Sequence, residues 1–375
     1  MVIGFDAKRA FQNDTGLGNY SRILICGIAQ EHQDVHAVLY SPNMSGNYRS
    51  YFSGFANIST RQPSGWDRHI PNLWHGFGIG LHLHGDKVTL YHGLSHELPH
   101  GIPKDIKRVV TMHDLFAWRY PQYYRPLERS VYRAKQRHSC KIADMVVAVS
   151  EQTKRDLIEI LHLPEEKIRV IYQTCDQIFW RPVTQDEKDE VREHYHLPDR
   201  YFISVGTIEE RKNQIAVVEA LASLPADIHL VIVGRANTRY HADLMRVVRS
   251  RNLETRVRIL SRADFDDFPA LYANAIGSVY VSHCEGFAIP IVESFCCDTP
   301  VIASNCSSMP EAAGDAALLV APNDSSAIAQ AMRQLIDDDS LRQELIAKGR
   351  RQRQRFTPKA IVDQFYNLYR ELLNK

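Results

Sequence analysis

The sequence lacks a long apolar run, a clear net charge and a secretory signal. None of its hydrophobic stretches approaches the ~20 residues that a helix needs to span a bilayer. Lysine and arginine together number 45 against 44 acidic residues, so the net charge of +1 gives no sign of a nucleic-acid partner. The opening residues, MVIGFDA, have the pattern of a strand rather than of a signal peptide. These absences favour a globular protein of the cytoplasm that does not bind nucleic acid.

Neither the cysteines nor the histidines form a convincing metal site. The seven cysteines are odd in number and include no C-x-x-C pair, so we expect buried, reduced thiols. HELPH (96–100) matches the zincin signature H-E-x-x-H letter for letter. Pro99 would break the helix that must carry both histidines on one face. We therefore expect a loop with incidental histidines and no metal.

The chain does contain an alternation of short apolar strands and helical segments along its 375 residues. Such a length exceeds one ordinary core and predicts two domains. Apolar strands separated by helices indicate parallel sheets covered on both faces. The predicted strands are 2–7, 35–40, 107–113, 144–150, 168–172, 201–206, 229–234, 257–260, 278–282 and 300–304. The predicted helices are 19–31, 126–142, 151–162, 213–223, 239–251, 325–337 and 358–375.

A break in this alternation at 173–190 divides the strands into two series. The sequence therefore predicts an α/β fold of two Rossmann-like, doubly wound domains. We place the first domain at 1–180 and the second at 181–357. Ligands of doubly wound folds bind outside the carboxyl ends of the strands, so we expect the site in a cleft between the two domains.

The segment HCEGFAIPIVESF (283–295) follows a predicted strand and carries two glutamates, Glu285 and Glu293. Pro290 fits the first turn of a helix, so Glu285 lies in the preceding loop and Glu293 within the helix. Backbone amides of residues 286–289 would then lie at the positive end of the helix dipole and form an anion site. Spacing alone is explained equally well by two exposed glutamates that favour the dipole.

Several motifs occur together in one order. They are TGLGNYSRIL (15–24), SVGTIEERKNQIAVVEAL (204–221), HLVIVG (229–234), FPALYANA (268–275) and the segment 283–324. This set resembles glycosyltransferase family 4, whose members are retaining enzymes with the GT-B fold of two Rossmann-like domains. The resemblance covers most of the chain and is dense from 200 to 325. It implies that a nucleotide sugar binds the second domain, that an acceptor binds the first, and that helix 358–375 packs back on the first domain. No metal or other cofactor is implied.

The resemblance also assigns roles within the segment 283–295. Glu285 would orient a hydroxyl of the donor sugar and stabilise positive charge at the anomeric carbon. Glu293 would accept hydrogen bonds from the ribose, and a carboxylate suits both tasks because it is a pure acceptor. The backbone amides of Phe287, Ala288 and Ile289 would hold sugar hydroxyls and the distal phosphate. Gly286, also assigned to donor binding, would let another group approach closely.

Arg211 and Lys212 follow the first strand of the second domain in VGTIEERKN (205–213). Transfer from a nucleotide sugar leaves a diphosphate, and two adjacent cations neutralise its growing charge without a metal. We predict that they stabilise the leaving group, as the resemblance also implies. The alternative is a solvated pair of cations whose charges are balanced by Glu209 and Glu210. Gly206, at the end of the same strand, is assigned to donor binding.

The loop TGLGNYS (15–21) holds only part of a dinucleotide fingerprint, because Ser21 replaces the third glycine. NAD binding is therefore disfavoured. The resemblance implies that this loop approaches the donor phosphates or the acceptor, and Gly16 and Gly18 would permit that approach. A simple helix-capping turn is the alternative.

His113 ends the strand in RVVTMHDLFAWRYP (108–121), and Asp114 follows it. This placement resembles the mannosyltransferase-like branch of the family, in which the histidine contacts the donor sugar or positions the acceptor hydroxyl. A histidine with only a structural hydrogen bond is the alternative. We name His113 a site residue without assigning it base catalysis, because retention in the resembled family is explained by same-face attack, in which the leaving phosphate takes the acceptor proton.

The segment 118–138 interleaves aromatic residues with Arg119, Arg125, Arg129, Arg133, Lys135 and Arg137. It would contact a membrane surface or a lipid-linked glycan, or form a solvated amphipathic helix with its aromatic side packed.

The resemblance to the mannosyltransferase-like branch makes GDP-mannose the first donor to test. It also implies that the protein takes part in the assembly of a bacterial lipid-linked polysaccharide at the inner face of the membrane. Two alternatives stay open, a nucleotide-sugar 2-epimerase and a catalytically silent binding protein. The segment 170–180 departs from the family pattern PNGVD, which leaves the contacts near 173–176 unassigned.

Overall fold

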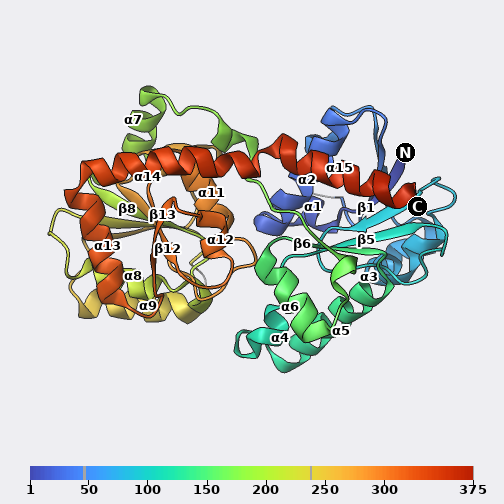
Figure 1. Ribbon diagram of the computed structural model, residues 1–375, viewed down its shortest axis with the longest axis horizontal. Helices are drawn as coiled ribbons and strands as arrows, with labels where there is room; N and C mark the ends of the chain where they lie inside the picture. Colours follow the sequence, from blue (N-terminus) through green and yellow to red (C-terminus); the bar gives the residue numbers. More distant parts are fainter. Residues whose placement is uncertain (45–47, 237–238, 375) are drawn as a thin grey trace. The chain divides into compact units, whose positions relative to one another are not determined.

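The computed structural model describes residues 1–44, 48–236 and 239–374. The chain forms two compact units, shown in Figure 1, and each is described by itself below. The first unit comprises Met1–Thr174 with Thr357–Lys375, and the second comprises Cys175–Phe356. The sequence placed the division after residue 180. Phe179 belongs to the second unit because its buried ring packs against Phe265 and Tyr272, with centroids 5.9 and 6.1 Å away.

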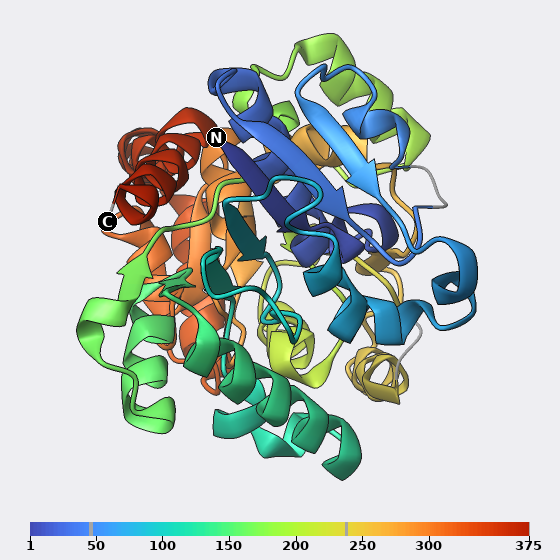
Figure 2. The same ribbon diagram turned by 90° about the vertical axis from the view of Figure 1, so that its right-hand side faces the viewer.

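Among the described residues the first unit holds a seven-stranded sheet in the order β3-β2-β1-β4-β5-β6-β7, with every strand pair parallel. Figure 2 shows β1 to β3 side by side in blue. The strands are β1 Val2–Asp6, β2 His36–Tyr40, β3 Ile58–Arg61, β4 Leu90–Gly93, β5 Lys107–Met112, β6 Met145–Ala148 and β7 Ile168–Val170. The order reverses between β1 and β4, which is the switch point where ligands of doubly wound sheets bind.

The second unit repeats this plan, with six parallel strands described in the order β10-β9-β8-β11-β12-β13. They are β8 Tyr201–Val205, β9 His229–Val233, β10 Val257–Leu260, β11 Gly277–Tyr280, β12 Val301–Ser304 and β13 Ala317–Val320. Its switch point lies between β8 and β11. The predicted α/β fold of two doubly wound domains is confirmed. All ten predicted strands are present, whereas β3, β4 and β13 were not predicted.

Helices cover both faces of each sheet (Figure 1). Those of the first unit are α1 Lys8–Gln12, α2 Gly16–Glu31, α3 Pro71–Leu73, α4 Phe116–Arg119, α5 Pro126–Ile142, α6 Glu151–Leu161 and α15 Pro358–Leu373. Those of the second are α7 Gln185–His194, α8 Gln214–Leu221, α9 Arg239–Ser250, α10 Phe268–Ala273, α11 Ile289–Cys296, α12 Met309–Ala313, α13 Ser325–Asp337 and α14 Asp339–Gln352. A search of the described residues finds no helix that combines the length and the apolar character needed to cross a membrane.

Successive residues of the central strands of the first unit enter two different cores. In β2, Ala37 and Leu39 join one buried cluster, whereas Val38 and Tyr40 join the other. This two-residue period follows from the pleat of a strand, which directs neighbouring side chains to opposite faces. Because both faces are covered by helices, these strands are apolar throughout, and this continuous apolar character made them recognisable in the sequence.

The last helix, α15, belongs to the first unit and packs against α2 (Figure 1). The two helices approach so closely that a Cβ on Gly27 would lie 2.4 Å from Cγ2 of Val362. A buried hydrogen bond of 2.7 Å also joins the Tyr369 hydroxyl to Nδ1 of His92 in β4. Helix α15 is therefore part of the first core, although 182 residues of the second unit (175–356) precede it in the chain.

Candidate active site

The loops that follow β8 and β11 carry the predicted donor-binding residues of the second unit. Gly206 ends β8 with a φ of +141°, which side chains other than glycine rarely adopt. Asn213 ends the same loop with a φ of +58° and joins the two loops, since its Nδ2 donates to the Val281 carbonyl at 3.2 Å. The Arg211 carbonyl also accepts from the His283 N–H at 2.8 Å. The two loops are thus fixed against each other at the switch point of the sheet.

The structure brings Glu285, Arg211 and Lys212 into one buried cluster. The Glu285 carboxylate is 2.7 Å from Nζ of Lys212 and 2.8 Å from Nη1 of Arg211. Arg211 also pairs with Glu209 at 2.6 Å, and Lys212 donates to the Tyr280 hydroxyl. The side chains of Glu285, Lys212 and Arg211 are 9%, 13% and 21% exposed, so this is no solvated surface pair.

Electrostatics keep Glu285 ionised inside the protein. Burial opposes its charge, but the attraction of Arg211 and Lys212 outweighs burial and lowers the pKa of Glu285 to about 2. Burial lowers the pKa of Lys212, and the Glu285 carboxylate counteracts that effect. Glu285 therefore holds two cations side by side in a position where an unpaired ammonium would tend to lose its proton.

Residues 281–288 form a loop, and hydrogen bonds with residues that follow β12 fix its backbone. The Glu285 carbonyl accepts hydrogen bonds from the hydroxyls of Ser307 and Ser308 at 2.9 and 2.8 Å, and its N–H donates to the Ser307 hydroxyl at 3.2 Å. Ala288 caps helix α11 in the left-handed region, with a φ of +72°. Helix α11 starts at Ile289, with Pro290 in its first turn as the sequence predicted. A helix start can offer N–H groups to an anion or hydroxyl, but here Pro290 has no N–H and the Ile291 N–H donates to the Ala288 carbonyl at 3.1 Å.

Glu293 lies in the middle of α11, where the charge of Lys212 has only a minor effect on its pKa. Its Oε2 accepts a hydrogen bond of 2.9 Å from the Tyr272 hydroxyl. Burial raises the pKa of Glu293 to about 7, although this hydrogen bond acts in the opposite direction. Glu285 and Glu293 therefore differ in charge near neutral pH, and the second is the more easily protonated of the two.

Sequence reasoning missed the polar residues that complete these contacts. Asn213, Tyr272, Ser307 and Ser308 lie within the motifs quoted above, but no role was predicted for them, and Tyr280 lies in the predicted strand 278–282. The segment SNCSSMPE, next to a helix start, was the only available signal for the two serines.

His113 is buried in the first unit with both ring nitrogens bonded. Its Nε2 donates to the Leu94 carbonyl at 2.8 Å, and its Nδ1 accepts from Nε2 of Gln173 at 2.7 Å. Burial lowers its pKa to about 3, so the ring is neutral. Tyr20 packs edge-on against it, with centroids 4.7 Å apart. Gln173 lies where the sequence departs from the family pattern, and its contact with His113 is the structural counterpart of that departure.

The two glycines of the first loop have different surroundings. A Cβ on Gly18 would lie 1.8 Å from the Asn13 carbonyl oxygen, so the close approach at this position is made by the chain itself. A Cβ on Gly16, in the first turn of α2, would meet no atom within 4 Å. Of the two, only Gly16 leaves open space beside the helix start.

This difference predicts opposite effects of alanine on stability. Gly18→Ala should destabilise the first unit by about 1–3 kcal/mol, because the backbone of Asn13 must move. Gly16→Ala should leave stability within about 1 kcal/mol of the wild type or raise it, since alanine favours a helix. Urea unfolding followed by circular dichroism measures both. Equal stability of the two variants would contradict the packing argument.

The histidine motif does not form the helix that a zincin site requires. Residues 96–100 are not helical, and His96 has a φ of +66°. Across the described ranges no group of three or more histidine, cysteine, aspartate or glutamate side chains could hold a metal ion. None of the seven cysteines forms a disulfide, and five of them are buried.

Several arginines of the basic and aromatic segment 118–138 form contacts with other side chains of the first unit. Arg133 and Arg137 both lie over the ring of Trp118, 4.9 Å from its centroid. Arg119 pairs with Asp156 and Glu159. Helix α5 also exposes two apolar side chains one turn apart, Leu127 at 79% and Val131 at 47%.

Comparisons with known proteins agree with this geometry. Residues 186–352 match the family described as glycosyl transferases group 1, and residues 15–177 match glycosyltransferase family 4. The chain is 29% identical to the O-antigen chain mannosyltransferase B of Escherichia coli, over 96% of both chains. It is 26% identical to the O-antigen chain mannosyltransferase RfbU of Salmonella typhimurium, over 88% of this chain and 89% of that protein.

A solved structure has the same fold. The sucrose-phosphate synthase of Thermosynechococcus elongatus superimposes with a TM-score of 0.81 at 21% identity, over 100% of this chain and 99% of that one. The two parallel-sheet units thus have the GT-B fold. The family matches follow each other along the chain, and each falls largely within one of the two units. The chain therefore belongs to glycosyltransferase family 4, and its second unit is the group 1 glycosyltransferase domain.

Proposed function

We propose that this glycosyltransferase moves mannose from GDP-mannose to a glycan or lipid-linked acceptor, with retention of configuration and without a metal. The observation that carries the proposal is the buried cluster in which Glu285 holds Arg211 and Lys212 side by side. Two fixed cations at the switch point of the second sheet match the charge that develops on a diphosphate leaving group.

The fixed donors of this cluster support a dianionic ligand. Glu285 and Glu209 hold the guanidinium of Arg211 and the ammonium of Lys212 in place. A diphosphate would add acceptors for Arg211 and Lys212, whose donors are already positioned. The cations need not be reorganised as the sugar–phosphate bond breaks, which is the condition under which electrostatic stabilisation contributes most.

The remaining parts of the donor would lie along the loop and α11. Glu285 would orient a sugar hydroxyl, residues 286–289 would bind sugar hydroxyls and the distal phosphate, and Glu293 would bind the ribose. Gly206 lies next to Lys212, since a Cβ there would be 3.5 Å from Cε of Lys212, and we assign it to donor binding. In the first unit, His113 acts as a positioning residue, because its two nitrogens are already bonded.

The mannose assignment and the setting rest on the relatives. Two of them are named as O-antigen chain mannosyltransferases. We infer that the chain acts on a lipid-linked glycan at the cytoplasmic face of a membrane. The exposed Leu127 and Val131 of α5, beside Arg125 and Arg129, would contact the lipid surface.

A donor screen tests the proposal. GDP and GDP-mannose, at about a hundred times their dissociation constants, should raise the melting temperature by roughly 3–10 °C. UDP-glucose and UDP-N-acetylglucosamine should not. GDP-mannose should also be slowly hydrolysed, and chromatography of the products detects this reaction. Stabilisation by uridine nucleotides alone would contradict the GDP-mannose assignment, and a 2-epimerised nucleotide sugar formed without acceptor would contradict transfer.

A further inference from the structure

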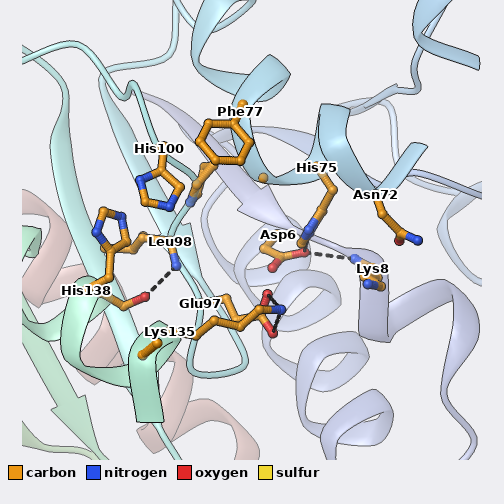
Figure 3. A pocket seen from close by; sticks show the side chains of 14 residues that line it. Asp6, Lys8, Asn72, His75, Phe77, Glu97, Leu98, His100, Lys135 and His138 are labelled. Atoms are coloured by element: carbon orange, nitrogen blue, oxygen red, sulfur yellow. Dashed lines mark hydrogen bonds and ion pairs between the residues drawn. The ribbon is translucent and has the colours of Figure 1, made fainter. Parts of the chain in front are cut away.

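The first unit contains a cavity of about 560 Å³ that none of the roles above uses (Figure 3). It lies at the carboxyl ends of β1 and β4, which is the switch point of the first sheet. Its walls come from the end of β1 and the start of α1, from α3 and the π-helical turn that follows it, from the loop after β4, and from α5. A volume of this order is typical of small-molecule sites.

Asp6 supplies a buried carboxylate, and the hydrogen bonds described below involve only one of its two oxygens. The side chain is 3% exposed, and its Oδ1 is 3.0 Å from Nε2 of His75 and accepts from the Lys8 N–H at 3.1 Å. Burial opposes the charge, but the interaction with His75 outweighs it, and the pKa of Asp6 is lowered. Among the described residues no donor forms a hydrogen bond with its other oxygen, Oδ2. An ionised oxygen in this position favours a ligand that brings a hydroxyl donor.

Glu97 supplies a second carboxylate from another segment. Nζ of Lys135 lies 2.9 and 3.0 Å from its two oxygens. The acids on the cavity wall are thus each paired with a base, Asp6 with His75 and Glu97 with Lys135. Lys8 adds a single further cation. Walls so nearly balanced favour a neutral, hydroxyl-rich ligand over a diphosphate, which would need an excess of positive charge.

An aromatic surface lines the other side of the cavity. The ring of Phe77 stacks on His100, with centroids 4.6 Å apart and an interplanar angle of 8°. His100 in turn lies 3.9 Å from the ring of His138. Figure 3 shows Phe77 and His100 together, with Asp6 and Glu97 reaching the cavity from other segments. Phe77 is 56% exposed, so its apolar face is available to a ligand.

We propose that this cavity binds the terminal sugar ring of the acceptor, a neutral pyranose. Its hydroxyls would donate to Oδ2 of Asp6 and to Glu97, and its C–H face would rest on Phe77. A pyranose has this combination of an apolar face and hydroxyl edges, which a lipid chain or a phosphate lacks. The inference rests on the proposed transferase function, because it names the acceptor group of the same reaction.

Acceptor kinetics test the inference with octyl α-mannoside as the probe and GDP-mannose as the donor. Phe77→Ala and Asp6→Asn should each raise the KM for the probe about ten- to a hundredfold. Acceptor-independent hydrolysis of GDP-mannose should stay within about twofold of the wild type, because both residues belong to the first unit, whereas the donor cluster belongs to the second. Leu81→Ala is the matched control, since Leu81 is 85% exposed and does not line the cavity.

The outcomes separate this inference from the proposed function. An unchanged KM for the probe in both cavity variants would overturn the acceptor site while leaving the transferase intact. Saturation-transfer NMR tests binding to the wild-type enzyme with the probe at about 10 mM, a concentration at which even a weak ligand binds. The absence of binding under these conditions would also overturn the inference. A preference of more than tenfold for the 6-phosphorylated probe would contradict the neutral-ligand argument. Absence of GDP-mannose hydrolysis in the wild type would instead count against the proposed function.

Discussion

Replacing Arg211 and Lys212 together by alanine should lower the rate of sugar transfer by about a thousandfold or more. The loss of one fixed donor to a developing negative charge costs about 10²–10³ in rate, and these two cations occupy one site. Donor hydrolysis without acceptor should fall by a similar factor, because the same bond to the diphosphate breaks. The decisive measurement is the single-turnover rate at saturating GDP-mannose, which separates chemistry from binding.

Two controls make this result interpretable. The double variant leaves Glu285 buried without its partners, which is destabilising, so its thermal unfolding should be compared with that of the wild type. Adding Glu285→Gln removes the unpaired charge and should restore stability without restoring the rate. Arg350 and Arg351 are another pair of adjacent cationic residues, on α14, and their replacement by alanine should leave the rate unchanged. A double variant of Arg211 and Lys212 with full activity would contradict the role of leaving-group stabiliser.

The sequence predicts the parts of this fold that depend on local pattern. Helix α5 starts at Pro126 and ends at Ile142, as its periodicity and proline indicate, and Pro290 lies in the first turn of α11. The strands that were missed are short or polar. Thus β4 reads LYHG, and β3, an edge strand, reads ISTR. Such four-residue segments become strands because neighbouring strands pair with them, which no single segment encodes.

The donor site likewise has a part that the sequence predicts and a part that it does not. Glu285, Arg211 and Lys212 carry a recognisable order along the chain, and the structure shows that they meet. Their mutual neutralisation, and the raised pKa of Glu293, arise from burial and from contacts between distant segments. The cavity of the first unit was hidden for a similar reason. Glu97 and His100 belong to the histidine motif, yet their neighbours come from β1, α5 and the turns after α3.

Replacing Glu293 by alanine should weaken the binding of GDP-mannose about ten- to a hundredfold. The variant removes charge-assisted hydrogen bonds to the ribose, which contribute about 1.5–3 kcal/mol. Isothermal titration calorimetry measures this difference directly. Glu190→Ala is a suitable control, because Glu190 is an exposed glutamate on α7 of the same unit. An unchanged affinity in Glu293→Ala would contradict the ribose role.

The pH dependence of binding gives this prediction a second, independent readout. The pKa of Glu293 is raised to about 7, so the acid is mostly protonated at pH 6 and mostly ionised at pH 8. If the ribose hydroxyls need the carboxylate, the dissociation constant of GDP-mannose should fall about tenfold as the pH rises from 6 to 8, in proportion to the ionised fraction. Glu293→Gln cannot ionise, and its affinity should not change over this range. A wild-type affinity that is flat with pH, or that declines as Glu293 ionises, would show that the charged form is not the one that binds the ribose.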